Sequence, residues 1–261
     1  MTPAILARRT APLPLLAAAL VLAVSWGVDA QGRGGPGGAP PPAKTAAPID
    51  VTGYWVSLIV DEWRFRVDPQ KGDVLYMPIN AAARRMAQAW DPAKDEADGN
   101  QCKAYGAVGV MQRPGRLHLT WADDNTLTME ADAGTQTRSL HFGQVPGASG
   151  EPTWQGTSVA SWQTSGGRGR AAMPGPRSGT LKIVTTNLRP GYLRKNGVPY
   201  SDKAVLTEYI NLLTGAAGEK YLVVTAMVDD PTYLTQPFVR SYQFKRQPDA
   251  AGWDPTPCLA K

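Results

Sequence analysis

The chain has 261 residues, of which 43% are hydrophobic and 19% charged, and its formal net charge is +5. This length is enough for one domain with a sizeable core. The positive charge is modest and dispersed. Its densest places, Arg84-Arg85 and residues 168–177, lack the interleaved aromatic residues of a nucleic-acid platform. We therefore expect no nucleic-acid partner.

The first 30 residues have the pattern of a secretory signal peptide. A basic head at Arg8-Arg9 is followed by an apolar run over residues 15–24 and by the small residue Ala30 at a cleavage position. The apolar run is shorter than the roughly 20 residues that a membrane span needs. We predict cleavage after Ala30, a periplasmic or extracellular location and no stable membrane insertion afterwards. An uncleaved membrane anchor is the alternative.

Residues 31–48 are dominated by Gly, Pro and Ala. Such a segment cannot bury enough apolar surface to offset the entropy lost on ordering, so we predict a flexible tether. The remainder, residues 49–261, is expected to form a single β-rich domain.

The chain contains two cysteines, Cys102 and Cys258. An even pair in an exported protein predicts a disulfide, which here would attach the C-terminal tail to the domain. A catalytic thiol needs a nearby histidine, and a metal site needs more ligands than two cysteines and two histidines easily supply. We therefore expect neither a metal nor an organic cofactor.

From Val51 onward the hydrophobic pattern mostly has a period of two, which is typical of β-strands. One helix is expected over residues 80–90, with Asn80 as its N-cap. Residues 201–213 fit either a helix face or a strand. We expect about nine strands in all, including segments 53–67, 116–121, 127–130, 135–142, 153–163, 180–186, 221–228 and 238–246.

An antiparallel sheet of this size has to protect its edges by closing or by stacking. Aromatic residues share predicted strand faces with Ser, Thr and Asp, which favours a barrel over a dry sandwich. The predicted fold class is all-β with minor α: an antiparallel β-barrel or strongly curled sheet with one short helix.

Two resemblances agree with this fold. Gly53-Tyr54-Trp55 resembles the Gly-x-Trp element that opens lipocalins, which implies a lipocalin-like barrel but no particular ligand. Residues 114–246 resemble a functionally uncharacterised family of secreted bacterial β-rich proteins. That resemblance implies a strand around Glu208 and an exported location, and it assigns no catalytic residue. Its motifs include Trp154-Gln155-Gly156-Thr157-Ser158, Leu206-Thr207-Glu208-Tyr209 and the segment from Asp229 to Pro237.

The aromatic residues indicate a function. Four tryptophans fall on single faces of two predicted strands, with small polar residues and Asp61 between them, as in a ligand cavity; a solid aromatic core is the alternative. We predict binding of a small apolar or aromatic molecule. Arg138 and Ser158 are expected to orient it, and the segment from Tyr192 to Gly197 to act as a lid at the rim. The predicted walls are Trp55, Trp63, Trp154 and Trp162.

Two further functions stay open. In a cofactor-independent isomerase, lyase or hydrolase, Asp61 or His118 would move a proton and Arg138 would stabilise developing negative charge. A structural salt bridge from Asp61 to Arg138 or Arg64 is the alternative. His118, Glu130 and His141 would meet only if their strands bring them to one face. The third function is an envelope protein-interaction module.

Overall fold

The computed structural model describes residues 41–145, 150–164 and 178–261. The predicted leader, most of the predicted tether and the basic segment 168–177 lie outside the described residues. Within the described part, no helix has the length and apolar character that crossing a membrane requires.

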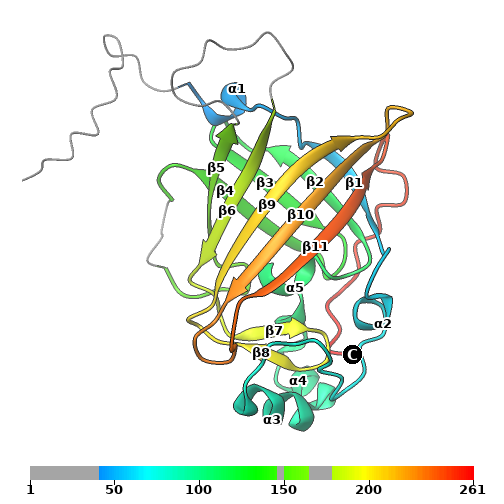
Figure 1. Cartoon of the computed structure of the whole chain (residues 1–261), viewed down its shortest axis with the longest axis vertical. Helices are drawn as coiled ribbons and strands as arrows, with labels where there is room; N and C mark the ends of the chain where they lie inside the picture. Colours follow the sequence, from blue (N-terminus) through cyan, green and yellow to red (C-terminus); the bar gives the residue numbers. More distant parts are fainter. Residues whose placement is uncertain (1–40, 146–149, 165–177) are drawn as a thin grey trace, which may run out of the picture. The chain divides into compact units, whose positions relative to one another are not determined.

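Nine strands close into a barrel in the order β1-β11-β10-β9-β6-β5-β4-β3-β2, with β2 pairing back onto β1 (Figure 1). The predicted β-barrel is confirmed, and so is the meander formed by β2, β3 and β4. The strands are β1 (Gly53–Leu58), β2 (Arg116–Trp121), β3 (Thr126–Ala131), β4 (Gln136–Phe142), β5 (Thr157–Thr164), β6 (Gly179–Thr186), β9 (Val205–Thr214), β10 (Lys220–Asp229) and β11 (Phe238–Arg246).

The expectation of a wholly antiparallel barrel is wrong at one place. β4 and β5 pair in parallel through three residue pairs, from Leu140 opposite Ser158 to Phe142 opposite Ala160. Parallel neighbours need a connection of a dozen or more residues, and residues 143–156 provide one. The barrel is therefore mixed.

The remaining elements are short. Four of them, α3, α4, β7 and β8, lie together at one end of the barrel, and α1 lies at the other end (Figure 1). The helix predicted over residues 80–90 is confirmed as α3, and Asn80 Oδ1 accepts a hydrogen bond of 3.0 Å from the Ala83 N–H. The expectation of a single short helix is wrong, because the described residues contain further helices of four to six residues, too short to leave a helical period in the sequence. The elements are α1 (Ala43–Ala46), α2 (Trp63–Arg66), α3 (Ala81–Ala89), α4 (Pro92–Ala97), the 3₁₀ helix η1 (Gln101–Ala104), α5 (Ala107–Val110), β7 (Gly191–Arg194) and β8 (Val198–Tyr200).

Alternate residues of the barrel strands face inward and are fully buried. Strand β6 shows this clearly, since Leu181, Ile183 and Thr185 are inaccessible while their neighbours are partly exposed. Burial of one face in this way explains the period of two in the sequence. The indole of Trp55 is also fully buried, and its Nε1 donates to the Val51 carbonyl at 3.0 Å.

The predicted strand over residues 53–67 is too long. Strand β1 ends at Leu58, and the chain turns at Glu62, whose φ is +49°, before α2 begins at Trp63. Likewise β5 begins only at Thr157, after Gly156 with a φ of +60°. Asp61, Trp63 and Trp154 are consequently not on barrel strands. The ambiguous segment 201–213 is a strand, since β9 covers most of it.

The disulfide between Cys102 and Cys258 is present as predicted. It joins η1 to the C-terminal tail. Two N–H groups of that tail extend the attachment: Thr256 N–H donates to the main-chain carbonyl of Asp132, and Ala260 N–H donates to the side-chain Oε1 of Glu96. The tail is thereby held against the barrel and the helical end.

Residues 41–48, at the end of the predicted tether, contact the barrel. Ala43 of α1 is buried, its N–H donates to Asn125 Oδ1 at 2.9 Å, and its carbonyl accepts from Trp162 Nε1 at 2.9 Å. Folded structure therefore begins before the expected start at residue 49.

Candidate functional site

The four tryptophans that were predicted to line a cavity are not brought together. Trp55 lies in the core, while Trp162 packs on Phe142 with ring centroids 5.3 Å apart. Trp154 lies before β5, beneath the guanidinium of Arg189, and Trp63 on α2 is 69% exposed. Trp55 and Trp162 thus both contact the hydrophobic core, of which Trp63 and Trp154 are not part.

Arg138 and Ser158, predicted to orient the ligand, do meet inside the barrel. The Arg138 guanidinium donates to both carboxylate oxygens of Glu208, at 3.3 and 2.8 Å, and to Thr185 Oγ1 at 3.0 Å and Ser158 Oγ at 3.3 Å. The Arg138 and Glu208 side chains are only 2% and 1% exposed. This arrangement is a buried ion pair with two hydroxyl partners.

Glu208 was not among the predicted site residues. The alternation of Leu206, Glu208 and Ile210 along β9 places the carboxylate on the buried inward face. The sequence did contain a signal for this pair: Glu208 is a lone carboxylate on an apolar strand face, and Arg138 lies on the apolar face of another strand.

The candidate proton-transfer residues Asp61 and His118 do not contact the Arg138–Glu208 pair and have other partners. The Asp61 side chain is 53% exposed, and its nearest basic partner is Arg66 at 3.7 Å, not Arg138 or Arg64. His118 lies beside Glu130, with Nδ1 2.8 Å from Oε2, and stacks on the Tyr54 ring at 4.0 Å. His141 instead lies opposite Thr126, at the other end of β3.

The predicted lid from Tyr192 to Gly197 is a buried hairpin, formed by β7 and β8. Leu193, Arg194 and Asn196 are at most 1% exposed. A segment packed this tightly cannot open as a rim loop, so the expectation of a lid is wrong. Across the described residues, no group of three or more His, Cys, Asp and Glu side chains is placed to hold a metal ion.

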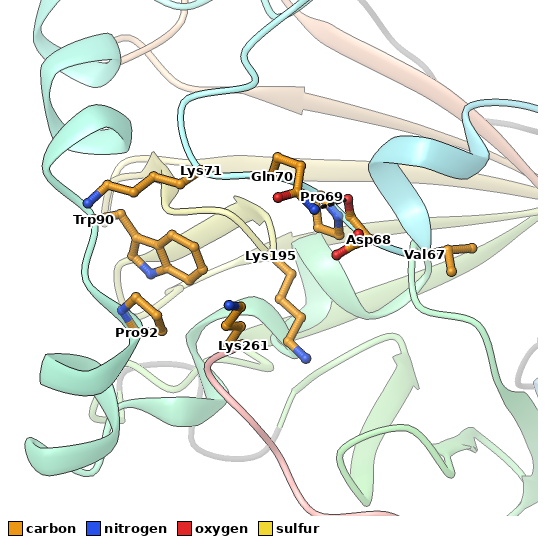
Figure 2. Close-up of a pocket in the computed structure, with 9 residues that line it drawn as sticks. All are labelled: Val67, Asp68, Pro69, Gln70, Lys71, Trp90, Pro92, Lys195 and Lys261. Carbon is orange, nitrogen blue, oxygen red and sulfur yellow. Dashed lines mark hydrogen bonds between the residues drawn. The ribbon is translucent and has the colours of Figure 1, made fainter.

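A cleft of about 270 Å³ lies beside this hairpin, and we call it the Trp90 cleft (Figure 2). Figure 2 shows Trp90 and Pro92 on one side and the segment 67–71 along another, with the side chains of Lys195 and Lys261 between them. The lining residues are Val67, Asp68, Pro69, Gln70, Lys71, Trp90, Pro92, Lys195 and Lys261.

Asp95 holds the aromatic wall of the Trp90 cleft. This buried carboxylate accepts hydrogen bonds from Trp90 Nε1 at 3.0 Å, from the Tyr192 hydroxyl at 2.7 Å and from Lys103 Nζ at 2.9 Å. Burial, followed by the hydrogen bond to Asp95, raises the pKa of Tyr192, so its hydroxyl remains a donor. The indole is therefore fixed in orientation.

Asn196 and the disulfide-linked tail hold the other walls. Asn196 Nδ2 donates to the carbonyl oxygens of Gln70 and Asp73, at 3.0 and 2.9 Å, which fixes the segment 67–71 against the hairpin. Lys261 follows Ala260 of the tail, whose N–H donates a hydrogen bond to Glu96 Oε1. Lys195 extends from the hairpin turn, with Nζ 5.3 Å from the centre of the Tyr105 ring.

The Trp90 cleft combines apolar walls with positive charge. Counted over side chains alone, the three lysines Lys71, Lys195 and Lys261 exceed the one carboxylate, Asp68, by two positive charges. A pre-formed concave site with an aromatic wall and a few charged groups is typical of small-molecule binding. The sequence did not indicate this site because its residues come from four separate segments.

Comparisons of the chain with protein-family models, with curated proteins and with solved structures found no match. The resemblances to lipocalins and to the secreted bacterial family accordingly stay predictions.

Proposed function

We propose that this protein is an exported binding protein whose Trp90 cleft holds a small molecule with an apolar or aromatic body and a negatively charged group. The observation that carries the proposal is the cleft itself, where a fixed indole and two prolines face three lysines. The proposed ligand is still apolar or aromatic, as the sequence predicted, but we now place its binding site in the Trp90 cleft and not inside the barrel.

The core of the barrel supports this choice of site. Residues from opposite sides of the barrel, such as Leu127, Leu181 and Leu222, are fully buried and belong to one continuous hydrophobic cluster. A core packed in this way stabilises the barrel as a scaffold, and rigid scaffolds commonly carry binding residues on the segments at their ends.

Export is supported by the disulfide between Cys102 and Cys258, since such bonds persist in oxidising compartments. The two candidate proton-transfer residues do not support the enzyme alternative together, because Asp61 pairs with Arg66 while His118 pairs with Glu130. Binding is therefore the function we assign.

The test uses two matched probes, 2-naphthoate and its neutral analogue 2-naphthalenemethanol. Titrations followed by tryptophan fluorescence and by calorimetry compare the wild type with Lys195→Ala. Loss of one charge-assisted hydrogen bond should weaken naphthoate binding about tenfold and leave binding of the alcohol nearly unchanged. The matched control is Lys203→Ala, an exposed lysine that does not line the cleft.

Equal naphthoate affinities in Lys195→Ala and the wild type would contradict the proposal. Absence of any binding by the wild type at millimolar naphthoate would contradict it as well.

A further inference from the structure

Four arginines gather around Tyr242 where β11 meets α2, β7 and the segment after α5. Arg66 comes from α2, Arg113 follows α5, Arg194 ends β7, and Arg240 lies two residues before Tyr242 on the same face of β11. The Arg66 guanidinium lies 5.3 Å from the centre of the Tyr242 ring. We call this group the arginine cluster.

Three of these side chains are buried. Arg66, Arg113 and Arg194 are 2%, 7% and 1% exposed. Burial lowers the pKa of Arg113 and of Arg194 to about 10, so both guanidinium groups still carry their charge at neutral pH. A buried charge of this kind needs a counter-charge or several hydrogen-bond partners.

The carboxylates available do not balance the arginine cluster. Glu62 lies 2.8 Å from Arg240 and 3.7 Å from Arg194, and Asp61 lies 3.7 Å from Arg66. Four guanidinium groups against two carboxylates leave a formal surplus of two positive charges. The nearby Asp73 is already paired with Arg64, at 2.6 Å.

Arg113 has no acidic partner within the part of the chain that the structure describes. Since its side chain is almost completely buried, this guanidinium accounts for one of the two surplus positive charges.

Several donors of the buried arginines also lack acceptors among the described residues. These are Arg66 Nη2, Arg194 Nη2, and both Nε and Nη2 of Arg113. Main-chain carbonyls satisfy other donors, as where Arg66 donates to Gln112 and Leu58. Nε and Nη2 of one guanidinium form the fork that binds two oxygens of a phosphate or carboxylate.

The backbone at Glu62 agrees with a functional arrangement. Its φ of +49° is unusual for a residue with a side chain, and the carboxylate faces Arg194 and Arg240 without capping α2. Strained backbone of this kind persists where surrounding contacts determine it, and it is common at binding sites.

We propose that the arginine cluster binds a doubly charged oxyanion, either inorganic phosphate or the phosphate group of a phosphorylated small molecule. The anion would accept from the free donors of Arg66, Arg113 and Arg194, and its two charges would match the surplus. This site is distinct from the Trp90 cleft, and the inference does not depend on the function proposed for that cleft.

The test measures thermal unfolding after refolding from urea, so that the buried site fills as the protein folds. Phosphate, phenyl phosphate, sulfate and acetate are each compared with chloride at equal ionic strength. At phosphate concentrations about a hundredfold above Kd, the wild-type Tm should rise by about 5–10 °C. Acetate, with one charge, should give a smaller rise.

Arg113→Met should remove the phosphate-dependent rise in Tm, because it replaces the unpaired guanidinium with an apolar chain of similar length. The exposed control Arg85→Met should retain the rise, as should Lys195→Ala, which separates this site from the Trp90 cleft. If Arg113→Met does not fold, Arg66→Lys tests the same point, since it keeps the positive charge but removes the free Nη2 donor.

The two phosphate sources give different results. A rise with inorganic phosphate alone identifies the free ion, and a rise with phenyl phosphate as well identifies a phosphorylated molecule. Equal Tm values in phosphate and chloride would overturn the proposal, since ordered water would then satisfy the donors. An undiminished phosphate effect in Arg113→Met and Arg66→Lys would overturn it too.

Discussion

The buried pair of Arg138 and Glu208 gives the sharpest test of the barrel interior. Glu208→Gln keeps the shape of the side chain and removes its charge. The Arg138 guanidinium then remains in an interior where it is 2% exposed, with the hydroxyls of Ser158 and Thr185 and the new amide as neutral partners.

The size of the effect follows from the cost of an uncompensated buried charge. Breaking a buried ion pair by neutralising one partner typically destabilises by about 3–5 kcal/mol. The two donors to Glu208, at 3.3 and 2.8 Å, place this pair in that class. The double variant Arg138→Met/Glu208→Leu removes both charges, so we expect its stability to be within about 2 kcal/mol of the wild type.

The assay is urea unfolding at pH 7, followed by tryptophan fluorescence, with the m-value checked for constancy. The matched control is Glu130→Gln, because Glu130 is 40% exposed and pairs with His118 at the surface. Such pairs contribute at most about 1 kcal/mol. Equal losses for Glu208→Gln and Glu130→Gln would refute the expectation that neutralising Glu208 leaves Arg138 as an uncompensated buried charge.

Three further outcomes are expected. Replacing both cysteines of the Cys102–Cys258 disulfide by serine should lower the urea midpoint. For a sequence separation of 156 residues, the chain-entropy model gives a loss of about 5 kcal/mol in the free energy of unfolding. An unchanged midpoint would contradict this. Gly197→Ala should destabilise more than Gly218→Ala by at least about 1 kcal/mol in the same assay. Both glycines have positive φ, but only at Gly197 would the new Cβ clash with the side chain of Trp90. Equal losses would show that the indole moves aside without cost. Burial raises the pKa of three tyrosines, Tyr192, Tyr200 and Tyr242. At about pH 11 the near-ultraviolet absorbance of the folded protein should therefore lack their phenolate signal until urea is added, and the free energy of unfolding should fall above about pH 10, where the unfolded chain loses these protons. A full phenolate signal in the folded state would refute the burial of these side chains.

Where the sequence carried a local signal, its predictions are confirmed. Strands β2, β3, β4, β6, β10 and β11 coincide with alternating segments, because burial of one strand face imposes a period of two on the residues themselves. The helix after Asn80 was predictable for a similar reason, since its cap bonds an N–H only three residues away.

The failures occur where a local pattern continued past the end of its element. Alternation persists from Trp55 to Trp63, yet β1 ends at Leu58. At the turn that follows, Glu62 forms ion pairs with Arg194 and Arg240, which are more than a hundred residues away in the sequence. No pattern within the segment records those partners, so the indole of Trp63 was wrongly assigned to the barrel.

The candidate sites were predictable only in part. Arg138 and Ser158 were expected to act together, and they do meet inside the barrel. The Trp90 cleft and the arginine cluster were not anticipated, because each combines side chains from four segments that have no common spacing in the sequence.

The sequence by itself determined the alternating strands, the capped helix, the closed β-rich architecture and the pairing of two cysteines. These depend on composition and on neighbours a few residues apart. The tertiary structure alone decided that β4 and β5 run parallel, that Arg138 faces a carboxylate 70 residues away, and that lysines and arginines gather at the end of the barrel. Spacing along a strand states which face a residue occupies. Strand order and register, which depend on the packing of the whole chain, decide what that face meets.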